Sequence, residues 1–397
     1  MKIALLCSGL GNINRGHETF ARDLFELLKD TVDITLLKGG GDTTPRELVI
    51  ENIPRNAATL RHIHLPVSPK WMTAAQEQER LRIETATFAH SALRPLLEGG
   101  FDVIHCLEQE VCNQLYAFRH LFENTPKFLF SNGGAIPSAD LPACDFVQEH
   151  TEYNLKKNTS GKAFYLPHGV DTTRFHPGIH SDFRRRHAIP EDAFVVISVG
   201  TICYWHKRMD YVIREVAAIE RAYLIIAGQE CADTDAIRAL GHQLMGQRII
   251  FANLPHEELP QAYAAANAFT LGSLFETFGI VYIEAMAMGL PVFCTNHPNQ
   301  RNIVGNGIFI DMTVPGALTS ALKNVGESER SELGRLGMRR VADIYDMARL
   351  RERYVEHYKR MARSTVNLPR HTLGRKMLDN ARNIARKLAR QTRQSFL

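Results

Sequence analysis

Short, apolar, β-rich runs alternate with helical patterns along most of the chain, and this alternation constrains the fold more than any other feature. The run Lys2–Cys7 is followed by a glycine-rich turn, an amphipathic pattern over Glu18–Leu28 and a second run, Val32–Leu37. Such a strand–helix–strand unit requires parallel strands joined by a right-handed crossover. We therefore predict α/β structure with a parallel sheet at the N-terminus.

The remaining strand patterns fall into two sets, one on each side of a break in the chain. Each run is short and bounded by Gly, Pro or Asn: Phe101–His105, Lys127–Phe130, Phe194–Val199, Tyr223–Ala227, Arg248–Phe251, Ala268–Leu271 and Pro291–Cys294. Helical patterns cover Ala74–Leu97 and Arg339–Arg363, and prolines and glycines gather between residues 167 and 178. We predict two doubly wound, Rossmann-like domains, 1–168 and 169–344.

The composition is that of a soluble globular protein, with 397 residues of which 45% are hydrophobic and 23% are charged. The apolar runs are shorter than the roughly 18 residues that a membrane-spanning helix needs, and no signal-peptide cleavage pattern follows the first run. The seven cysteines are scattered without a CxxC pair, so the sequence supports neither a disulfide framework nor a structural zinc site. We expect a cytoplasmic protein.

Positive charge is concentrated at the C-terminus. Residues 370–397 carry eight basic residues and one acidic residue, a formal charge of +7, which leaves −3 on the preceding 369 residues. Apolar residues recur there at helical spacing, as in a basic amphipathic helix. Such a helix suits contact with an anionic membrane, and packing on the protein body or on another subunit is the alternative. Basic and aromatic residues do not interleave there, so we expect no nucleic-acid partner.

The first glycine turn, residues 9–16, follows the first strand and precedes the first helix. A dinucleotide fingerprint GxGxxG would place its third glycine at position 14, where the chain has Asn14. Glycines at this place allow backbone amides to approach a phosphate at a helix N-terminus. An ordinary strand-to-helix turn explains the same residues equally well.

Two carboxylates bracket the start of a helical pattern in the second half. Glu276 precedes this helix, Thr277–Gly279 supply amides near its N-terminus, and Glu284 lies about one turn inside it. A helix N-terminus attracts anions. The arrangement therefore suits a ligand with both phosphate and hydroxyl groups, such as a sugar nucleotide, whereas a capping Glu276 and a solvated Glu284 are the structural alternative.

These carboxylates and four further segments resemble one family in the same order along the chain. Each segment stands at the place of one family motif. The segments are Glu276–Glu284 with Phe278-Gly279 inside, His168-Gly169-Val170-Asp171 with Phe175 and Pro177, Gly200 with Lys207-Arg208 and Asp210, Tyr223–Gly228, and Arg15–Glu18. By these segments taken together, the chain resembles retaining glycosyltransferases of the GT-B fold, family 4, also called glycosyl transferases group 1. The resemblance runs from about residue 3 to residue 311.

The resemblance implies a GT-B fold, with two Rossmann-like domains facing across a cleft. It also implies that C-terminal helices of about 345–397 cross back and pack on the first domain. It implies catalytic roles for Glu276 and Lys207, a helix start that binds the donor diphosphate, and no metal or other cofactor. The donor-binding residues that it implies are Gly16, Arg208, Thr277, Phe278, Gly279, Ile280 and Glu284, with Glu284 on the ribose hydroxyls.

The chain departs from the family pattern at three places. Thr201 stands where the family commonly has an arginine, and Asn302 lies near the place of a frequent glutamate. Asn132 lies in the stretch where the family often places a histidine beside the donor sugar, so Asn132 and Gly133 become candidate sugar contacts. His105 is a further candidate for the sugar or acceptor, with a purely structural histidine as the alternative.

The implied activity is transfer of a sugar from a nucleoside-diphosphate sugar to an acceptor hydroxyl with retention of configuration, in polysaccharide, glycolipid or other glycoconjugate synthesis. The acceptor would be a carbohydrate, a lipid-linked group or another hydroxyl compound. Two alternatives stay open, a sugar-nucleotide epimerase of the same fold and a non-catalytic protein that binds sugar nucleotides or glycans.

Overall fold

The computed structural model describes residues 1–13 and 15–365, except for the side chains at positions 69–71 and 74. Within this range, residues 1–363 form one unit. The basic segment 370–397, for which we predicted an amphipathic helix and membrane contact, lies outside the described residues. Among the described residues, no helix is both long and apolar enough to span a lipid bilayer.

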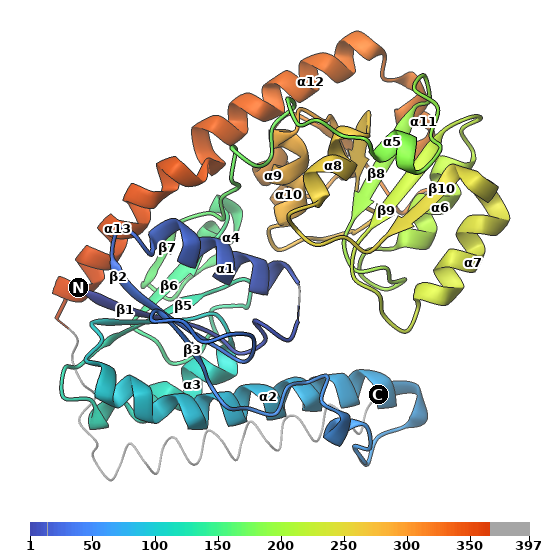
Figure 1. The fold of residues 1–397 in the computed structure, drawn as a ribbon. Helices are drawn as coiled ribbons and strands as arrows, with labels where there is room; N and C mark the ends of the chain where they lie inside the picture. Colours follow the sequence, from blue (N-terminus) through green and yellow to red (C-terminus); the bar gives the residue numbers. More distant parts are fainter. Residues whose placement is uncertain (14, 366–397) are drawn as a thin grey trace. The chain divides into compact units, whose positions relative to one another are not determined.

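The N-terminal half forms a parallel sheet of seven strands in the order β3-β2-β1-β4-β5-β6-β7 (Figure 1). The strands are β1 (Lys2–Cys7), β2 (Asp33–Lys38), β3 (Glu47–Val49), β4 (Val103–Cys106), β5 (Lys127–Ser131), β6 (Phe146–Glu149) and β7 (Ala163–Tyr165). The strand order reverses at β1, which pairs with both β2 and β4. Because all strands are parallel, their carboxyl ends meet at one edge, where ligands of open α/β sheets bind.

Helices cover both faces of this sheet. They are α1 (Gly16–Leu28), α2 (Pro69–Gly99), α3 (Gln109–Ala117) and α4 (Glu152–Lys157). One core lies between the sheet and α1 and includes Leu5, Phe20 and Leu24. The core on the opposite face takes Phe88 and Leu96 from α2. Alternate residues of β1 enter the two cores, so this strand is buried on both faces, as its continuous apolar run predicts.

The second sheet is also parallel and has the order β10-β9-β8-β11-β12-β13. Its strands are β8 (Val195–Val199), β9 (Tyr223–Ala227), β10 (Ile249–Ala252), β11 (Ala268–Thr270), β12 (Val292–Thr295) and β13 (Ile308–Ile310). Its helices are α5 (Phe183–Arg186), α6 (Met209–Ala217), α7 (Thr234–Met245), α8 (Leu259–Ala264), α9 (Ile280–Ala287), α10 (Pro298–Val304) and α11 (Ala317–Asn324). The prediction of two Rossmann-like parallel sheets is confirmed.

The C-terminal helical stretch returns to the first sheet. Helix α12 (Glu327–Arg340) ends in a π-helical turn, Val341–Tyr345, and α13 (Met347–Arg363) follows. Leu350, Tyr354, Tyr358 and Met361 of α13 are buried in the core that α1 also covers. This confirms the predicted crossing of a C-terminal helix to the N-terminal domain.

The helical pattern predicted over Arg339–Arg363 is interrupted near its start. The backbone of Val170, in the segment between the two sheets, pairs with this stretch: its N–H donates to the carbonyl of Tyr345 and its carbonyl accepts from Met347. Asp346 adopts an extended conformation there and accepts a hydrogen bond of 2.6 Å from Thr172 Oγ1. A contact far apart in the sequence therefore breaks the helix.

We predict that Phe269→Ala lowers the free energy of unfolding by about 3–5 kcal/mol, as expected for a fully buried phenylalanine. Phe269 lies on β11 and is 0% exposed. The matched control Phe118→Ala, at a residue that is 42% exposed, should change it by less than about 0.5 kcal/mol. Urea denaturation followed by circular dichroism measures both, and equal effects would contradict the assigned core.

Candidate functional site

Lys207 and Glu276, the two residues predicted to be catalytic, are in direct contact. Lys207 Nζ lies 2.6 Å from Glu276 Oε1, and His206 Nε2 lies 3.6 Å from the same oxygen. Lys207 follows β8 and Glu276 follows β11, and these strands are neighbours in the sheet. Both side chains are largely buried, so the ion pair is shielded from water and its charges interact strongly.

Close backbone packing fixes the two loops that carry this pair. A Cβ atom at Gly272 would come within 2.9 Å of the carbonyl oxygens of Lys207 and Arg208, so only glycine allows this approach. The side-chain amide of Asn299, which is completely buried, donates to the carbonyls of Glu276 and Thr277 at 2.6 and 2.9 Å. Asn299 is a positioning residue that no sequence pattern revealed.

Two helix N-termini lie next to each other beside this pair. Gly279 has a φ of +74° and precedes α9, and Phe278 before it is buried. A Cβ atom at Gly16, the first residue of α1, would lie 3.9 Å from Cδ1 of Ile280, the first residue of α9. The first N–H groups of each helix have no carbonyl partner within their helix. The predicted phosphate-binding residues of both halves are therefore brought together.

Glu284, predicted to hold ribose hydroxyls, is buried on α9 and has two partners. His256 Nε2 lies 2.8 Å from its Oε1, and the Tyr263 hydroxyl donates to its Oε2 over 2.8 Å. Burial lowers the pKa of His256, but the hydrogen bond and the charge of Glu284 outweigh burial and leave this pKa raised. The alternative of a solvated Glu284 is thus excluded by its burial.

A second carboxylate lies near His256 and was not predicted. Asp23, on α1, lies 3.6 Å from Arg174 Nη2, and burial raises its pKa to about 6, although the charges of His256 and Arg174 act in the opposite direction. His256 stands in a loop without periodic pattern, and Asp23 is one acid among several on its helix. The sequence therefore offered no signal for either residue.

The Arg208 side chain contacts other groups than Glu276, the partner of Lys207. Its Nη1 donates to the carbonyl oxygens of Gly272 and Met312 at 3.2 and 3.0 Å, and its guanidinium lies over the Tyr211 ring. These contacts hold the loop to its neighbours. The structure thus gives Arg208 a positioning role, and its contact with the donor phosphates stays a prediction.

His105 lies in the interior, at 0% exposure. Its Nδ1 is 2.7 Å from the Tyr358 hydroxyl of α13, and its Nε2 is 2.7 Å from Ser131 Oγ. Burial lowers the pKa of His105 to about 3, so the ring is neutral. The structure contradicts a direct sugar or acceptor contact and agrees with the structural alternative.

Asn132 lines a cavity of about 390 Å³. Its side chain accepts from the Ile136 amide and donates to Glu149 Oε1 over 2.9 Å, and Gly133 follows it in the chain. Glu149 is buried, its second oxygen Oε2 has no hydrogen-bond partner among the described residues, and burial raises its pKa. The other lining residues come mainly from the loop after β5 and from α4, with Phe275 and His297 from the second half.

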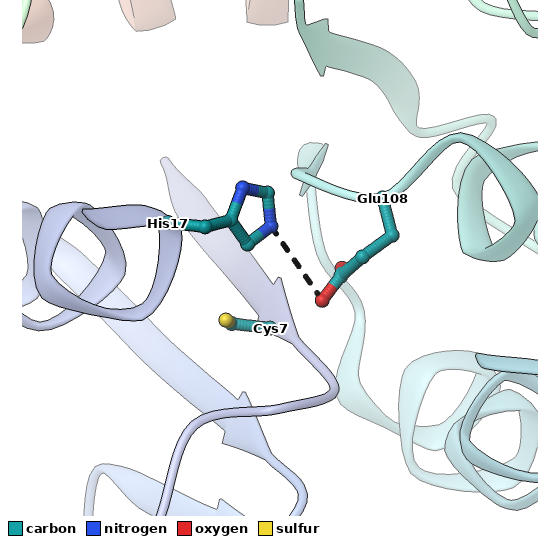
Figure 2. Close-up of side chains that lie close together, drawn as sticks. All are labelled: Cys7, His17 and Glu108. Atoms are coloured by element: carbon teal, nitrogen blue, oxygen red, sulfur yellow. Dashed lines mark ion pairs between the residues drawn. The ribbon is translucent and has the colours of Figure 1, made fainter. Parts of the chain in front are cut away.

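One group of side chains in the described part of the chain brings three metal-ligating atoms together. It consists of Cys7, His17 and Glu108, at the carboxyl edge of the first sheet (Figure 2). None of these three residues was predicted to bind a metal, because their spacing matches no metal-site pattern.

Part of the chain is similar in sequence to known enzymes. Residues 180–333 match the model of the family described as glycosyl transferases group 1. A D-inositol 3-phosphate glycosyltransferase 1 of Catenulispora acidiphila is 30% identical over 198 residues, 46% of this chain and 47% of that protein. A GDP-mannose-dependent alpha-(1-6)-phosphatidylinositol monomannoside mannosyltransferase of Mycolicibacterium smegmatis is 28% identical over 204 residues, 46% and 52% of the two chains. The chain thus spans about half the length of the curated relatives it matches.

Solved structures share the fold over a longer range. Sucrose-phosphate synthase from Thermosynechococcus elongatus has a TM-score of 0.75 at 20% identity and covers 91% of this chain and 99% of its own. Anabaena HepE, solved in complex with UDP and glucose, has a TM-score of 0.68 at 14% identity over 90% and 99% of the two chains. These likenesses confirm the predicted GT-B fold.

We predict that Glu284→Gln lowers the pKa of His256, because the variant loses the charge that opposes burial. Proton NMR titration of the His256 ring measures this pKa, and His256→Gln identifies the signal. In the wild type, the stabilisation from protonated His256 is present at low pH and is lost as the pH rises through its raised pKa. An unchanged titration midpoint in Glu284→Gln would contradict the pairing.

Proposed function

We propose that this chain is a retaining family 4 glycosyltransferase, and the match of residues 180–333 to the model of glycosyl transferases group 1 supports this. It moves a sugar from a nucleoside-diphosphate sugar to an acceptor hydroxyl. The observation that carries the proposal is the Lys207–Glu276 contact of 2.6 Å next to the start of α9. This combination offers a cation, hydrogen-bonding carboxylate oxygens and helix amides to one ligand that has phosphates and hydroxyls.

The donor diphosphate binds at the adjacent N-termini of α1 and α9. Free N–H groups and the helix dipoles favour an anion there, and Gly16 lets the backbone come close. Lys207 shares its charge between Glu276 and the diphosphate. The leaving diphosphate gains negative charge in the transition state, and fixed positive groups that are already in place stabilise this charge without reorganising.

The two carboxylates of the motif hold the rest of the donor. Glu276 accepts hydrogen bonds from hydroxyls of the transferred sugar, and Glu284 accepts them from the ribose. His256 and Tyr263 already occupy one site on each Glu284 oxygen. Each carboxylate oxygen has two lone pairs, so the ribose can bind without displacing these partners, which keep the carboxylate in place.

Attack by the acceptor takes place on the face from which the diphosphate leaves. A leaving phosphate oxygen accepts the proton of the acceptor hydroxyl, so the configuration is retained without an enzyme nucleophile. Lys207 and the helix amides supply the positive charge at the diphosphate. We therefore propose that transfer requires neither Mg²⁺ nor Mn²⁺ nor another cofactor.

The acceptor binds in the cavity beside Asn132. Glu149 offers an unpartnered carboxylate oxygen there, and Phe275, which lines the cavity, directly precedes Glu276. A buried carboxylate with a free oxygen suits the hydroxyls of a sugar or another polyol. The curated relatives are named for transfer to inositol phosphate and to a phosphatidylinositol mannoside, which agrees with a polyol acceptor.

We place this reaction in the cytoplasm, in glycolipid, polysaccharide or other glycoconjugate synthesis. A lipid-linked acceptor would be met at the membrane surface. The basic segment 370–397, outside the described residues, has the charge to contact anionic lipids there.

We predict that Lys207→Met and Glu276→Gln each lower kcat by about 100- to 1,000-fold, the range found when one transition-state contact is removed. Initial transfer rates with a nucleoside-diphosphate sugar measure this loss. The matched control Lys323→Met, at an exposed lysine of α11, should keep the wild-type rate. Near-normal rates in both site variants would show that the site is assigned wrongly.

Incubation with the donor alone separates this proposal from the two alternatives. A transferase leaves the sugar configuration of the donor unchanged, whereas an epimerase converts it, and NMR of the recovered nucleotide distinguishes them. Stabilisation by a nucleoside diphosphate in a thermal-shift assay, without turnover on any acceptor, would favour a binding protein.

Glu149→Gln should raise the KM for the acceptor by about 10- to 100-fold, the loss expected for a hydrogen bond to a charged group. The Kd for the donor nucleotide should stay unchanged. Glu152→Gln, at an exposed glutamate three residues later on α4, is the matched control. An effect on donor binding alone would place the acceptor elsewhere.

A further inference from the structure

Three side chains with different ligating atoms meet at the carboxyl edge of the first sheet. One ligating atom from each of Cys7, His17 and Glu108 lies within 4.8 Å of the other two. His17 Nε2 is 3.7 Å from Glu108 Oε1. Figure 2 shows the imidazole and the carboxylate pointing toward each other, with the thiol beside them.

The topology of the sheet produces this juxtaposition. Cys7 ends β1, Glu108 follows β4, and these two strands are neighbours and parallel. His17 is the second residue of α1, which returns over the same edge after the glycine turn. The ligating atoms therefore come from three rigid elements and do not depend on one mobile loop.

Several polar atoms of the group are buried without a partner. Within the described residues, His17 Nε2 and Glu108 Oε2 have no hydrogen bond, and neither has Oε2 of the neighbouring Glu18. The Glu108 side chain is only 10% exposed, and Ser8 orients it by donating from its amide and its hydroxyl to Oε1. Buried polar atoms are normally satisfied, so these atoms indicate a ligand.

The charges around the group also favour a cation. Glu18, Glu84 and Glu108 belong to one network, in which Arg55 lies 2.5 Å from Glu84 and 3.9 Å from Glu18. Ser8 links Glu84 to Glu108 through its hydroxyl. Three carboxylates thus lie around one guanidinium in this described network, and a divalent cation at the group would add positive charge among them.

We propose that Cys7, His17 and Glu108 form a binding site for one divalent transition-metal ion of the zinc class. Sulfur, imidazole and carboxylate together select zinc or cobalt over magnesium or calcium, which prefer oxygen ligands alone. Three protein ligands leave a fourth position for water. This ion is not part of the proposed transfer reaction, for which we propose no requirement for Mg²⁺ or Mn²⁺.

The geometry admits the ion after a small adjustment. Ligands of a tetrahedral zinc ion are about 3.5 Å apart, given bonds of about 2.0–2.3 Å. The three atoms lie within 4.8 Å of one another, so each pair needs to approach by up to about 1.3 Å. The His17 side chain is 35% exposed, which leaves an entry path beside the ring. Ligation ties the glycine turn and the start of α1 to the strand ends.

The test uses the full-length, tag-free protein loaded with Co²⁺, which replaces zinc and is visible by absorption spectroscopy. We expect one Co²⁺ per chain, visible d–d bands and a sulfur-to-cobalt charge-transfer band. Cys7→Ser should abolish the charge-transfer band. His17→Gln and Glu108→Gln should weaken Co²⁺ binding by about 100-fold or more.

The matched control is Cys106→Ser. Cys106 ends the neighbouring strand β4 and is as completely buried as Cys7, but it belongs to the core on the opposite face. This variant should keep the charge-transfer band. Wild-type protein without this band, or Cys7→Ser protein with it, overturns the proposal. If Cys7→Ser does not fold, His17→Gln decides: unchanged Co²⁺ affinity in a variant with native circular dichroism also overturns it.

Discussion

The parallel arrangement of the strands is the constraint on which the whole molecule depends. A parallel sheet needs a long connection after every strand, and all carboxyl ends lie on one edge. Lys207, Glu276 and the Cys7–His17–Glu108 group all stand at such an end, in the loop that follows one, or at the start of the next helix. Residues far apart in the sequence can therefore share a site without any special local structure.

Three buried carboxylates are paired with cations or hydrogen-bond donors from other segments of the chain. Glu276 has Lys207, Glu284 has His256 and Tyr263, and Glu84 has Arg55. An unpaired carboxylate at these depths would cost several kcal/mol, on the order of the stability of a domain. The pairing thus lets the fold keep charged groups ready for a ligand in a shielded place.

The sequence predicted the two sheets because their central strands are long enough to show an apolar run. It missed β7, Ala163–Tyr165, because this short strand has no fully buried residue and hence no apolar pattern. The resemblance assigned Lys207 and Glu276 to one donor site but did not predict their direct contact, which the neighbouring strands β8 and β11 bring about. His256, in a loop, and Asn299, at the start of α10, were missed because a residue that holds a single carboxylate or carbonyl carries no periodic signal.

Lys207 and Arg208 show why adjacent residues in a recognised motif need not share a role. Arg208 has a φ of +48°, the left-handed conformation that few residues other than glycine adopt. The chain turns at this residue, and the Arg208 side chain reaches two carbonyl oxygens, whereas Lys207 reaches Glu276. Two adjacent residues of the motif thus contact different parts of the site, because the backbone turns between their side chains.

The proposed metal site and the proposed donor site share the glycine turn of the first half. Cys7 precedes this turn, and His17 follows Gly16, where an added Cβ atom would lie 3.9 Å from Ile280 Cδ1 at the start of α9. Fixing a flexible backbone costs about 1–2 kcal/mol per residue. A metal ion bound to residues at both ends of the turn would fix part of this backbone before the nucleotide binds. Less conformational entropy would then be lost when the nucleotide binds. Preorganisation of the amides at Gly16 and metal occupancy would then be thermodynamically coupled, because each favours the same backbone conformation.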